Sequence, residues 1–405
     1  MAQGYRRTAA PRLSNLPRHT ILALIKTLIP EPSPMSTAPS GRPPFRADHV
    51  GSLLRPAPLR QAWKARSAGQ INEADFERVT NDAIRGVVAL QEQAGLQVLN
   101  DGEFRRGSYW LRFVQKTTGM GIRPAVFKFR DESDNVVEFT APHVEKKIHR
   151  SGPITVDEFR FVAPLTRATV KVTMPSPSTL HFWRGTSFAE PGTYATDEAF
   201  FADLSKVFQE ELAELHAAGG RYAQLDEVPL AMLCDPDIRD KVRAQGSDPD
   251  RLVDLYVDAI NQAVGGRPAD MKIGIHMCRG NFKGKYLSEG GYGDVAEKLF
   301  KGAKVDHFLL EYDTPRAGDF SPLRHVPADK GVVLGIVSSK VADLESVDFL
   351  RARIDDAGRF INVSQLGLSP QCGFASTVAG NPVTESDQLA KLARCVEVAK
   401  KVWGD

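Results

Sequence analysis

The sequence predicts an α/β protein built as a single (β/α)8 TIM barrel, with a hairpin insertion after the second strand and a flexible N-terminal arm. From residue 45 onward, short apolar runs alternate with longer helical patterns, as in βαβ units that build a parallel sheet. Eight such runs lie within roughly 350 residues, which suits a barrel with insertions. No G-x-G-x-x-G motif follows a predicted strand, which argues against a doubly wound dinucleotide-binding sheet.

The elements follow one another along the chain with one interruption. We predict strands at residues 47–50, 97–100, 168–174, 222–226, 272–276, 307–311, 332–336 and 360–363. We predict helices at residues 73–94, 197–218, 250–264, 294–302, 344–357 and 385–402. Residues 107–164 are rich in charged, β-branched and aromatic side chains and break the alternation, so we expect the hairpin insertion there.

The first 44 residues differ from the rest of the chain. They are basic and rich in proline, and Glu31 is their only acid. We expect residues 1–44 to be a disordered or non-native extension: a flexible arm, an organelle-targeting segment, or translation from upstream of a true start at Met35. Residues 45–405 are then expected to form one catalytic domain.

Composition excludes several classes of protein. The 405 residues carry a formal net charge of only +2, so neither nucleic acid nor a membrane surface is expected as a partner. No apolar run approaches the roughly 20 residues that a membrane span needs. Four cysteines in so long a chain do not make a disulfide scaffold, so we expect a reducing compartment, the cytoplasm.

Residues capable of metal chemistry gather at the predicted strand ends, where TIM barrels carry their active sites. Asp226 ends the fourth strand, His276 and Cys278 end the fifth, and Glu311 ends the sixth. Cys372 lies just beyond the eighth strand.

His276 and Cys278 are two residues apart, so an extended strand directs both side chains to the same face. Imidazole and thiolate are typical zinc ligands, Cys372 would add a second thiolate, and Glu311 could supply an oxygen. A single H-x-C pair is more often a buried cysteine beside a histidine. Ligand types at the ends of separate strands favour a metal site, and the C-x2-C spacing typical of structural zinc is absent from the sequence.

The motifs around these residues resemble those of cobalamin-independent methionine synthase. They are Ile275-His276-Met277-Cys278, the strand that ends in Glu311, and Pro370-Gln371-Cys372-Gly373, within a resemblance that runs from about His49 to Trp403. The resemblance implies that His276, Cys278, Glu311 and Cys372 bind Zn²⁺. It also implies that a methyl group moves to the thiol of homocysteine and forms methionine, with 5-methyltetrahydrofolate as the donor.

Three further segments resemble the family's substrate-binding segments. Gly51 and Ser52 resemble the turn that holds the homocysteine carboxylate, and Glu103 and Asp226 resemble the acids that bind its ammonium. Two carboxylates on one ammonium make charge-assisted hydrogen bonds, although salt bridges with Arg105 or Arg279 are the plainer alternative. Trp183 resembles the tryptophan that stacks on the pterin, and packing against the insertion is the alternative role.

The chain departs from the family pattern in two respects. It has the length of one barrel, whereas the full enzyme has two. The histidine that helps to protonate the leaving amine is missing, and Ser338 lies roughly at its place. Such general acid catalysis is worth about 10²–10⁴-fold. Ser338 is therefore a candidate catalytic residue together with Asp226. Lys340, His325 or water could replace the histidine, or the donor is a methyl-corrinoid or an epoxide.

Two other classes of function remain open from the sequence alone. One is a metal-free lyase resembling uroporphyrinogen decarboxylase, against which the H-x-C pair argues. The other is a zinc-dependent sensor that binds a thiol without turnover. The sequence is compatible with an oligomer and does not specify one.

Overall fold

The computed structural model describes residues 41–127, 129–130, 136–137 and 139–404. The expectation of a disordered or non-native extension at residues 1–44 lies outside the described residues, apart from 41–44. Those four residues lie against the sheet, because a Cβ on Gly331 would come within 2.5 Å of the Pro43 nitrogen.

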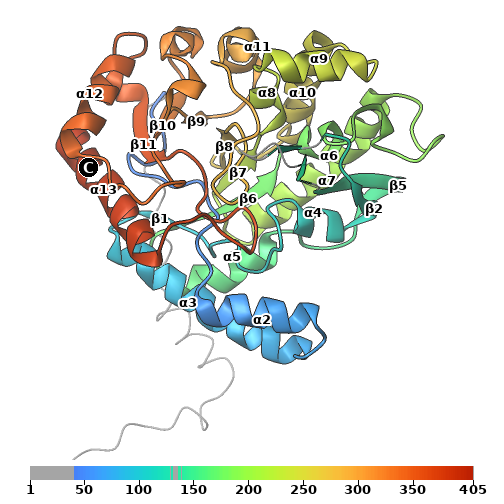
Figure 1. Cartoon of the computed structure of the whole chain (residues 1–405), viewed down its shortest axis with the longest axis horizontal. Coiled ribbons are helices and arrows are strands. Elements are labelled where there is room, and N and C mark those ends of the chain that lie inside the picture. The colour runs from blue at the N-terminus through green and yellow to red at the C-terminus, as the bar shows by residue number, and fades with distance from the viewer. Residues whose placement is uncertain (1–40, 128, 131–135, 138, 405) are drawn as a thin grey trace, which may run out of the picture.

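A curled, parallel sheet of seven strands forms the centre of the molecule (Figure 1). Its order is β1-β6-β7-β8-β9-β10-β11. Strands that follow one another along the chain within this sheet are therefore also neighbours in space. The strands are β1 (Val98–Leu99), β6 (Thr169–Pro175), β7 (Tyr222–Asp226), β8 (Lys272–Met277), β9 (His307–Glu311), β10 (Gly331–Val337) and β11 (Leu366–Pro370). Ala47 makes an isolated parallel bridge to Leu368, so the segment before β1 in the chain lies beside β11.

The prediction holds for six strands of this sheet and fails at its last one. Residues 360–363 are not a strand, and β11 begins only at Leu366. The side chain of Asn362 accepts a hydrogen bond from the Ser364 backbone at 2.8 Å and starts the 3₁₀ turn η6 (Val363–Gln365). An asparagine that bonds its own backbone two residues on favours a turn over a strand. Residues 47–50 were predicted as a strand. Among them only Ala47 makes a β-bridge, to Leu368, and this bridge is isolated and does not extend into a ladder.

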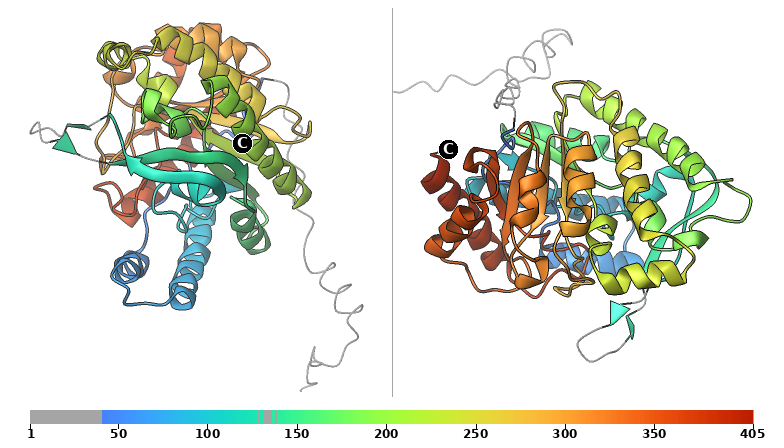
Figure 2. Two further views of the ribbon diagram at one scale, coloured as in Figure 1. Left: turned by 90° about the vertical axis from the view of Figure 1, so that its right-hand side faces the viewer. Right: turned by 90° about the horizontal axis from the view of Figure 1, so that it is seen from above.

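Helices surround the outer face of the sheet (Figures 1 and 2). The longer ones are α2 (Ala57–Ser67), α3 (Glu73–Gln93), α7 (Asp197–Ala217), α9 (Pro236–Ala244), α10 (Pro249–Ala263), α11 (Gly293–Gly302), α12 (Val347–Ala357) and α13 (Glu385–Trp403). The shorter ones are α4 (Leu111–Gln115), α5 (Val156–Val162), α6 (Thr179–Phe182) and α8 (Pro229–Met232). Side-chain caps fix several starts; Thr384, for example, forms a capping box with Asp387 at α13. None of the described helices is long and apolar enough to cross a membrane.

Residues between β1 and β6 form two antiparallel pairs outside the main sheet. β2 (Thr117–Pro124) pairs with β5 (Thr140–Arg150), and β3 (Phe129–Arg130) pairs with β4 (Val136–Val137). Val144 of β5 also bridges Ala189, which ties this segment to the chain beyond β6.

The inner face of the curled sheet holds a buried polar network. The Lys171 ammonium lies 2.7 Å from an Asp48 oxygen and 2.9 Å from the Gln224 carbonyl oxygen. Tyr222 donates to the other Asp48 oxygen at 2.7 Å. Burial alone would raise the pKa of Asp48, but the charge of Lys171 lowers it below its usual value. The network leads along β7 to Asp226, at the carboxyl edge of the sheet.

Candidate active site

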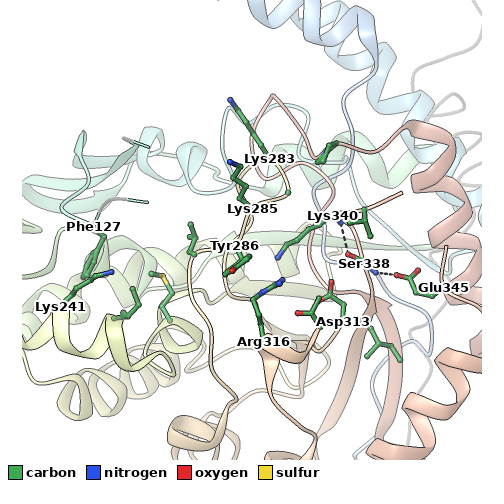
Figure 3. Close-up of a pocket in the computed structure, with 18 of the residues that line it drawn as sticks. Phe127, Lys241, Lys283, Lys285, Tyr286, Asp313, Arg316, Ser338, Lys340 and Glu345 are labelled. Carbon is green, nitrogen blue, oxygen red and sulfur yellow. Dashed lines mark hydrogen bonds between the residues drawn. The ribbon is translucent and has the colours of Figure 1, made fainter. Parts of the chain in front are cut away.

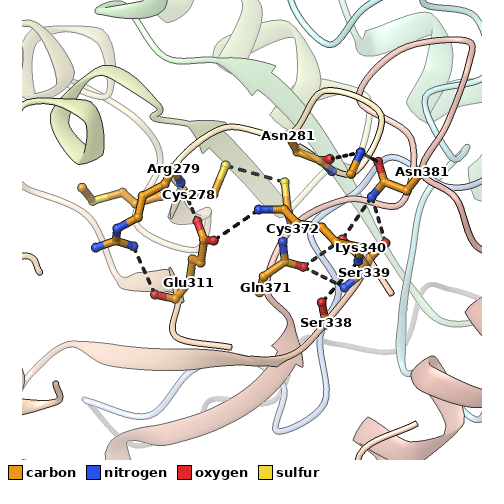
Figure 4. Close-up of polar contacts among 12 residues, drawn as sticks. Cys278, Arg279, Asn281, Glu311, Ser338, Ser339, Lys340, Gln371, Cys372 and Asn381 are labelled. Atoms are coloured by element: carbon orange, nitrogen blue, oxygen red, sulfur yellow. Dashed lines mark hydrogen bonds and ion pairs between the residues drawn. The ribbon is translucent and has the colours of Figure 1, made fainter. Parts of the chain in front are cut away.

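A histidine and two cysteines meet at the carboxyl edge of the sheet. His276 lies on β8, Cys278 follows that strand, and Cys372 follows β11. Their ligand atoms all lie within 4.8 Å of one another, and the two sulfurs are 3.6 Å apart (Figure 4). All three side chains are buried. Parallel strands end at one edge, which is why residues almost a hundred positions apart can form this group.

The surroundings of His276 fit a metal ligand. Its Nδ1 lies 3.2 Å from the carbonyl oxygen of Leu309, which fixes the ring and makes Nδ1 the protonated nitrogen. Its Nε2 is buried and has no hydrogen-bond partner in the described structure. A buried nitrogen lone pair beside two thiols suits a zinc site, because imidazole nitrogen and thiolate sulfur are typical zinc ligands.

The two thiols differ in acidity. Hydrogen bonding with Cys278 lowers the pKa of Cys372 well below its usual value, and the charge of Lys340 adds to this effect. The same contact raises the pKa of Cys278. A cation at this point would favour the thiolate form of both cysteines.

Glu311 lies next to this group and is engaged elsewhere. It is fully buried at the end of β9, and one carboxylate oxygen accepts a hydrogen bond from the backbone N–H of Arg279. The other oxygen is 3.4 Å from the Lys340 ammonium (Figure 4). Among the described residues Glu311 does not join the three-residue ligand group, so its role as a metal ligand stays a prediction.

The predicted acid pair lies at the same edge of the sheet. Glu103 accepts a hydrogen bond from the Thr173 hydroxyl at 2.6 Å and lies 3.6 Å from the Arg106 guanidinium. Arg106 itself makes a bidentate ion pair with Glu158 of α5. Glu103 has a left-handed backbone with φ 61°, which is unfavourable for a residue with a Cβ and is typical of functional positions. The salt-bridge alternative therefore involves Arg106, not Arg105 or Arg279.

Asp226 is electrostatically coupled to Glu103. Burial and the charge of Glu103 raise the pKa of Asp226 to about 7. The Gln224 amide donates to one Asp226 oxygen at 2.7 Å, and Lys171 holds the opposite end of that amide. Two buried acids that repel each other bind a shared cation well, because the cation relieves the repulsion.

Gly51 and Ser52 connect the acid pair to the metal group. A Cβ on Gly51 would lie 3.0 Å from a Glu103 oxygen and 2.7 Å from the Thr173 methyl group, so only glycine fits there. A Cβ on Gly373, the neighbour of Cys372, would lie 1.9 Å from the Ser52 hydroxyl. The turn at Gly51 and Ser52 thus contacts both halves of the site.

A cavity of ≈ 540 Å³ joins these groups, and we call it the active-site cavity. Glu103, Asp226, His276, Cys278 and Cys372 line it. Much of the remaining wall is aromatic, formed by Tyr109, Trp110, Phe139, Trp183 and Phe282. A largely apolar pocket with a few convergent polar groups is typical of small-molecule sites.

Trp183 and Ser338 line different cavities. Trp183 both lines the active-site cavity and packs edge-on against Phe139 at 5.3 Å, so the two roles considered for it are compatible. Ser338 does not line this cavity; it lies in a neighbouring cleft, where its backbone N–H donates to Glu345 at 2.7 Å. Lys340, two residues on, has its ammonium beside Glu311.

Sequence reasoning missed the residues that support the acid pair. Thr173 and Lys171 alternate on β6, and a polar residue at every second position of a buried strand is a signal of inward-facing function. Gln224 stands two residues before Asp226 and shares its face. The pairing of Arg106 with Glu158 spans 52 residues and has no local signal.

A curled parallel sheet with a His–Cys–Cys group and an acid pair at its carboxyl edge defines an α/β protein with a candidate metal-assisted active site. Comparison with known families is more specific: the model described as "Cobalamin-independent synthase, Catalytic domain" matches residues 45–401. The chain belongs to the cobalamin-independent methionine synthase family.

Individual relatives are similar in sequence to this chain over most of their own length. The Bacillus subtilis protein YxjH, which is named as uncharacterised, is 37% identical over 363 residues, 89% of this chain and 95% of YxjH. A methionine synthase of Pyrococcus abyssi is 30% identical over 326 residues, 80% of this chain and 85% of the relative. A solved structure from Listeria monocytogenes, titled as a candidate vitamin-B12-independent methionine synthase, has a TM-score of 0.70 and 31% identity, over 89% of this chain and 98% of that one.

Proposed function

We propose that this chain is a zinc-dependent methyltransferase that moves a methyl group from 5-methyltetrahydrofolate to the thiol of homocysteine and forms methionine. Membership of the family supports the reaction class. The observation that carries the proposal is the His276, Cys278 and Cys372 group, which opens into the same cavity as two carboxylates suited to an amino acid.

We also infer that the catalytic domain, residues 45–405, is a TIM barrel with a hairpin insertion after its second strand. The segment around Ala47 would complete the barrel as an eighth strand. In support, Leu368 donates to Arg46 O at 2.7 Å and Asp48 donates to Leu368 O at 3.0 Å on one side. On the other side, the Asn100 side chain donates to Gly51 O at 3.0 Å.

The chain's own residues account for binding of the amino-acid substrate. Glu103 and Asp226 would bind the homocysteine ammonium, whose charge offsets their mutual repulsion. The backbone at Gly51 and Ser52 would hold the carboxylate. With both ends fixed, the thiol of a substrate of this length points toward the cysteines.

The substrate thiol is the nucleophile. His276, Cys278 and Cys372 would hold the zinc ion, which would supply the Lewis-acid chemistry that lowers the pKa of a bound thiol. In the transfer, a bond forms between sulfur and the methyl carbon, the bond from that carbon to the donor nitrogen breaks, and the nitrogen takes a proton. The aromatic wall that includes Trp183 offers a flat apolar surface to the donor's ring.

The proton source is a separate proposal within this function. Ser338 stays the predicted replacement for the family's histidine, but its place in the neighbouring cleft favours delivery through water rather than by direct contact. A methyl-corrinoid donor would need no such proton. An epoxide would need none before its strained ring opens, and the alkoxide formed on opening would take a proton afterwards. Supplying each donor class with homocysteine and measuring the methylated or alkylated product would distinguish them.

A test of the central proposal compares two cysteines. Cys372→Ala removes a ligand, so we expect loss of stoichiometric zinc and of methionine formation. Cys234→Ala is the matched control, because Cys234 is equally buried but its thiol donates to Leu230 O at 3.4 Å, outside the metal group. Zinc is measured by plasma mass spectrometry and methionine by chromatography.

The outcomes separate the classes of function. Full methionine formation by Cys372→Ala would refute zinc-assisted thiol activation and revive a metal-free lyase. Zinc and thiol binding without turnover by the wild-type protein would favour a sensor. A cytoplasmic location is proposed as well, since all four cysteines are free thiols and the pair at 3.6 Å needs a reducing compartment to stay so.

A further inference from the structure

A second and larger cavity lies beside the active-site cavity. It has a volume of ≈ 1100 Å³ and lies beyond the carboxyl ends of β9 and β10 (Figure 3). Its walls come from the loop around residues 283–287, from α9 and from the start of α12. Leu287 lines both cavities, and Lys340 lines this one while its ammonium touches Glu311. We call it the cationic cleft, because lysines and arginines outnumber acids among its lining residues.

Among the charged side chains of its lining, positive ones outnumber negative ones. Five cations face it against two acids; the cations are Lys241, Lys283, Lys285, Arg316 and Lys340, and the acids are Asp313 and Glu345. Glu345 is already occupied by the Ser338 backbone at 2.7 Å and the Lys391 ammonium at 3.1 Å. The chain as a whole carries a net charge of only +2, so this excess is a local feature.

Several of these cations lack ionic partners. Lys241, Lys283 and Arg316 form no ion pair within the described part of the chain, and the buried Arg316 Nε has no hydrogen-bond partner there. The Arg316 guanidinium lies 3.9 Å from the centre of the Tyr286 ring. Stacking of this kind fixes the guanidinium plane and leaves its N–H edges to bind an anion.

The turn that carries Lys283 is built to present it. Phe282 and Lys285 exchange two backbone hydrogen bonds, at 2.9 and 3.0 Å, so that residues 283 and 284 form a tight two-residue turn. Lys283 has φ 54° and Gly284 has φ 82°. Positive φ at the first position favours asparagine or glycine, so Lys283 adopts a backbone conformation that is unfavourable for lysine.

We propose that the cationic cleft binds a small multivalent anion, with two or more carboxylate or phosphate groups on an apolar or aromatic body. The apolar part of the lining, which includes Phe127, Ile238 and Phe349, would contact that body. The volume suits a small molecule. The anion is either an extension of the methyl donor that passes Leu287 or a separate metabolite, and the chemistry of recognition is the same for both. The inference does not depend on methyl transfer.

The test uses benzene-1,3,5-tricarboxylate, whose carboxylates point apart and cannot chelate one metal ion. Binding to the full-length, zinc-loaded protein is measured by titration calorimetry at two salt concentrations. We expect saturable binding that weakens with salt, and about tenfold weaker binding to the Lys283→Gln/Arg316→Gln double variant. Lys400→Gln is the matched control, because Lys400 is exposed in the last turn of α13 and does not line the cleft.

Three results would overturn the proposal: no binding by the wild-type protein, equal affinity in the double variant, or equal binding of a neutral isostere of the probe. Circular dichroism checks the fold, and if the double variant unfolds, Lys283→Gln alone, at an exposed turn, replaces it. The neutral isostere 1,3,5-benzenetrimethanol should bind at least tenfold more weakly than the tricarboxylate, and equal binding would show that charge is not recognised. Competition of the tricarboxylate with the methyl donor in kinetics would identify the anion as part of the donor, and an unchanged donor KM would identify a separate metabolite. Because the binding assay needs no turnover, failure of the methyl-transfer proposal would be seen separately.

Discussion

The Gln224→Leu variant tests how the acid pair is held ready for an ammonium. In the wild-type protein the Gln224 amide donates to Asp226 at 2.7 Å, and its carbonyl oxygen accepts from Lys171 at 2.9 Å. Leucine keeps the volume and removes the donor. Lys171 keeps its ion pair with Asp48 at 2.7 Å, so the buried ammonium is not left alone.

The size of the effect follows from the charge on Asp226. A hydrogen bond to a charged group contributes about 1.5–3 kcal/mol, and its loss favours the protonated acid. The pKa of Asp226 is already about 7, so a further rise makes the protonated acid the main form at pH 7.5. Because each 1.36 kcal/mol changes the ratio of ionised to protonated acid tenfold, loss of a hydrogen bond in the middle of this range should lower the ionised fraction about tenfold. The dissociation constant for homocysteine should rise by a similar factor.

The assay compares homocysteine with 4-mercaptobutyrate, which has the thiol and carboxylate but no ammonium. Gln224→Leu should raise KM for homocysteine about tenfold and leave KM for the analogue unchanged. Gln365→Leu is the matched control: its amide donates to Pro327 O at 2.9 Å and Lys330 O at 2.8 Å, at the opposite edge of the sheet. An equal rise of KM for both thiols, or for the control variant, would refute the assignment of Asp226 to the ammonium.

Two further predictions concern pH and the metal loop. Because the pKa of Asp226 is raised to about 7 and the ammonium needs the ionised form, kcat/KM for homocysteine relative to 4-mercaptobutyrate should fall as the pH drops through about 7; a flat ratio would contradict the role of Asp226. Gly373→Ala places a Cβ 1.9 Å from the Ser52 hydroxyl and displaces the loop that carries Cys372, so zinc affinity should fall about tenfold or more. Gly293→Ala is the control, because no atom lies within 4 Å of its new Cβ, and it should keep its zinc. Competition with a fluorescent chelator measures the zinc affinity of both variants.

The sequence predicted the parts of the site that depend on strand geometry. Asp226, His276 and Glu311 were placed at strand ends, and parallel strands bring their ends to one edge. The alternation of side chains along β8 placed His276 and Cys278 on one face. The same logic anticipated Cys372, although the strand before it begins six residues later than predicted.

Loop conformations and long-range pairings were beyond that reasoning. Ser338 and Lys340 stand two residues apart in the loop after β10, and only the structure shows that Lys340 points to Glu311 while Ser338 lines the cationic cleft. No periodicity fixes the backbone of such a loop. The left-handed conformation of Glu103 and its approach to Arg106 were likewise invisible, because they depend on contacts with β6 and α5.

Zinc-edge X-ray absorption on the purified protein, with and without homocysteine, tests the central claim most directly. The account predicts bound zinc with two sulfur neighbours at rest, supplied by Cys278 and Cys372, and a third sulfur when homocysteine is added. Absence of zinc, or a zinc shell that does not change with the thiol, would contradict it.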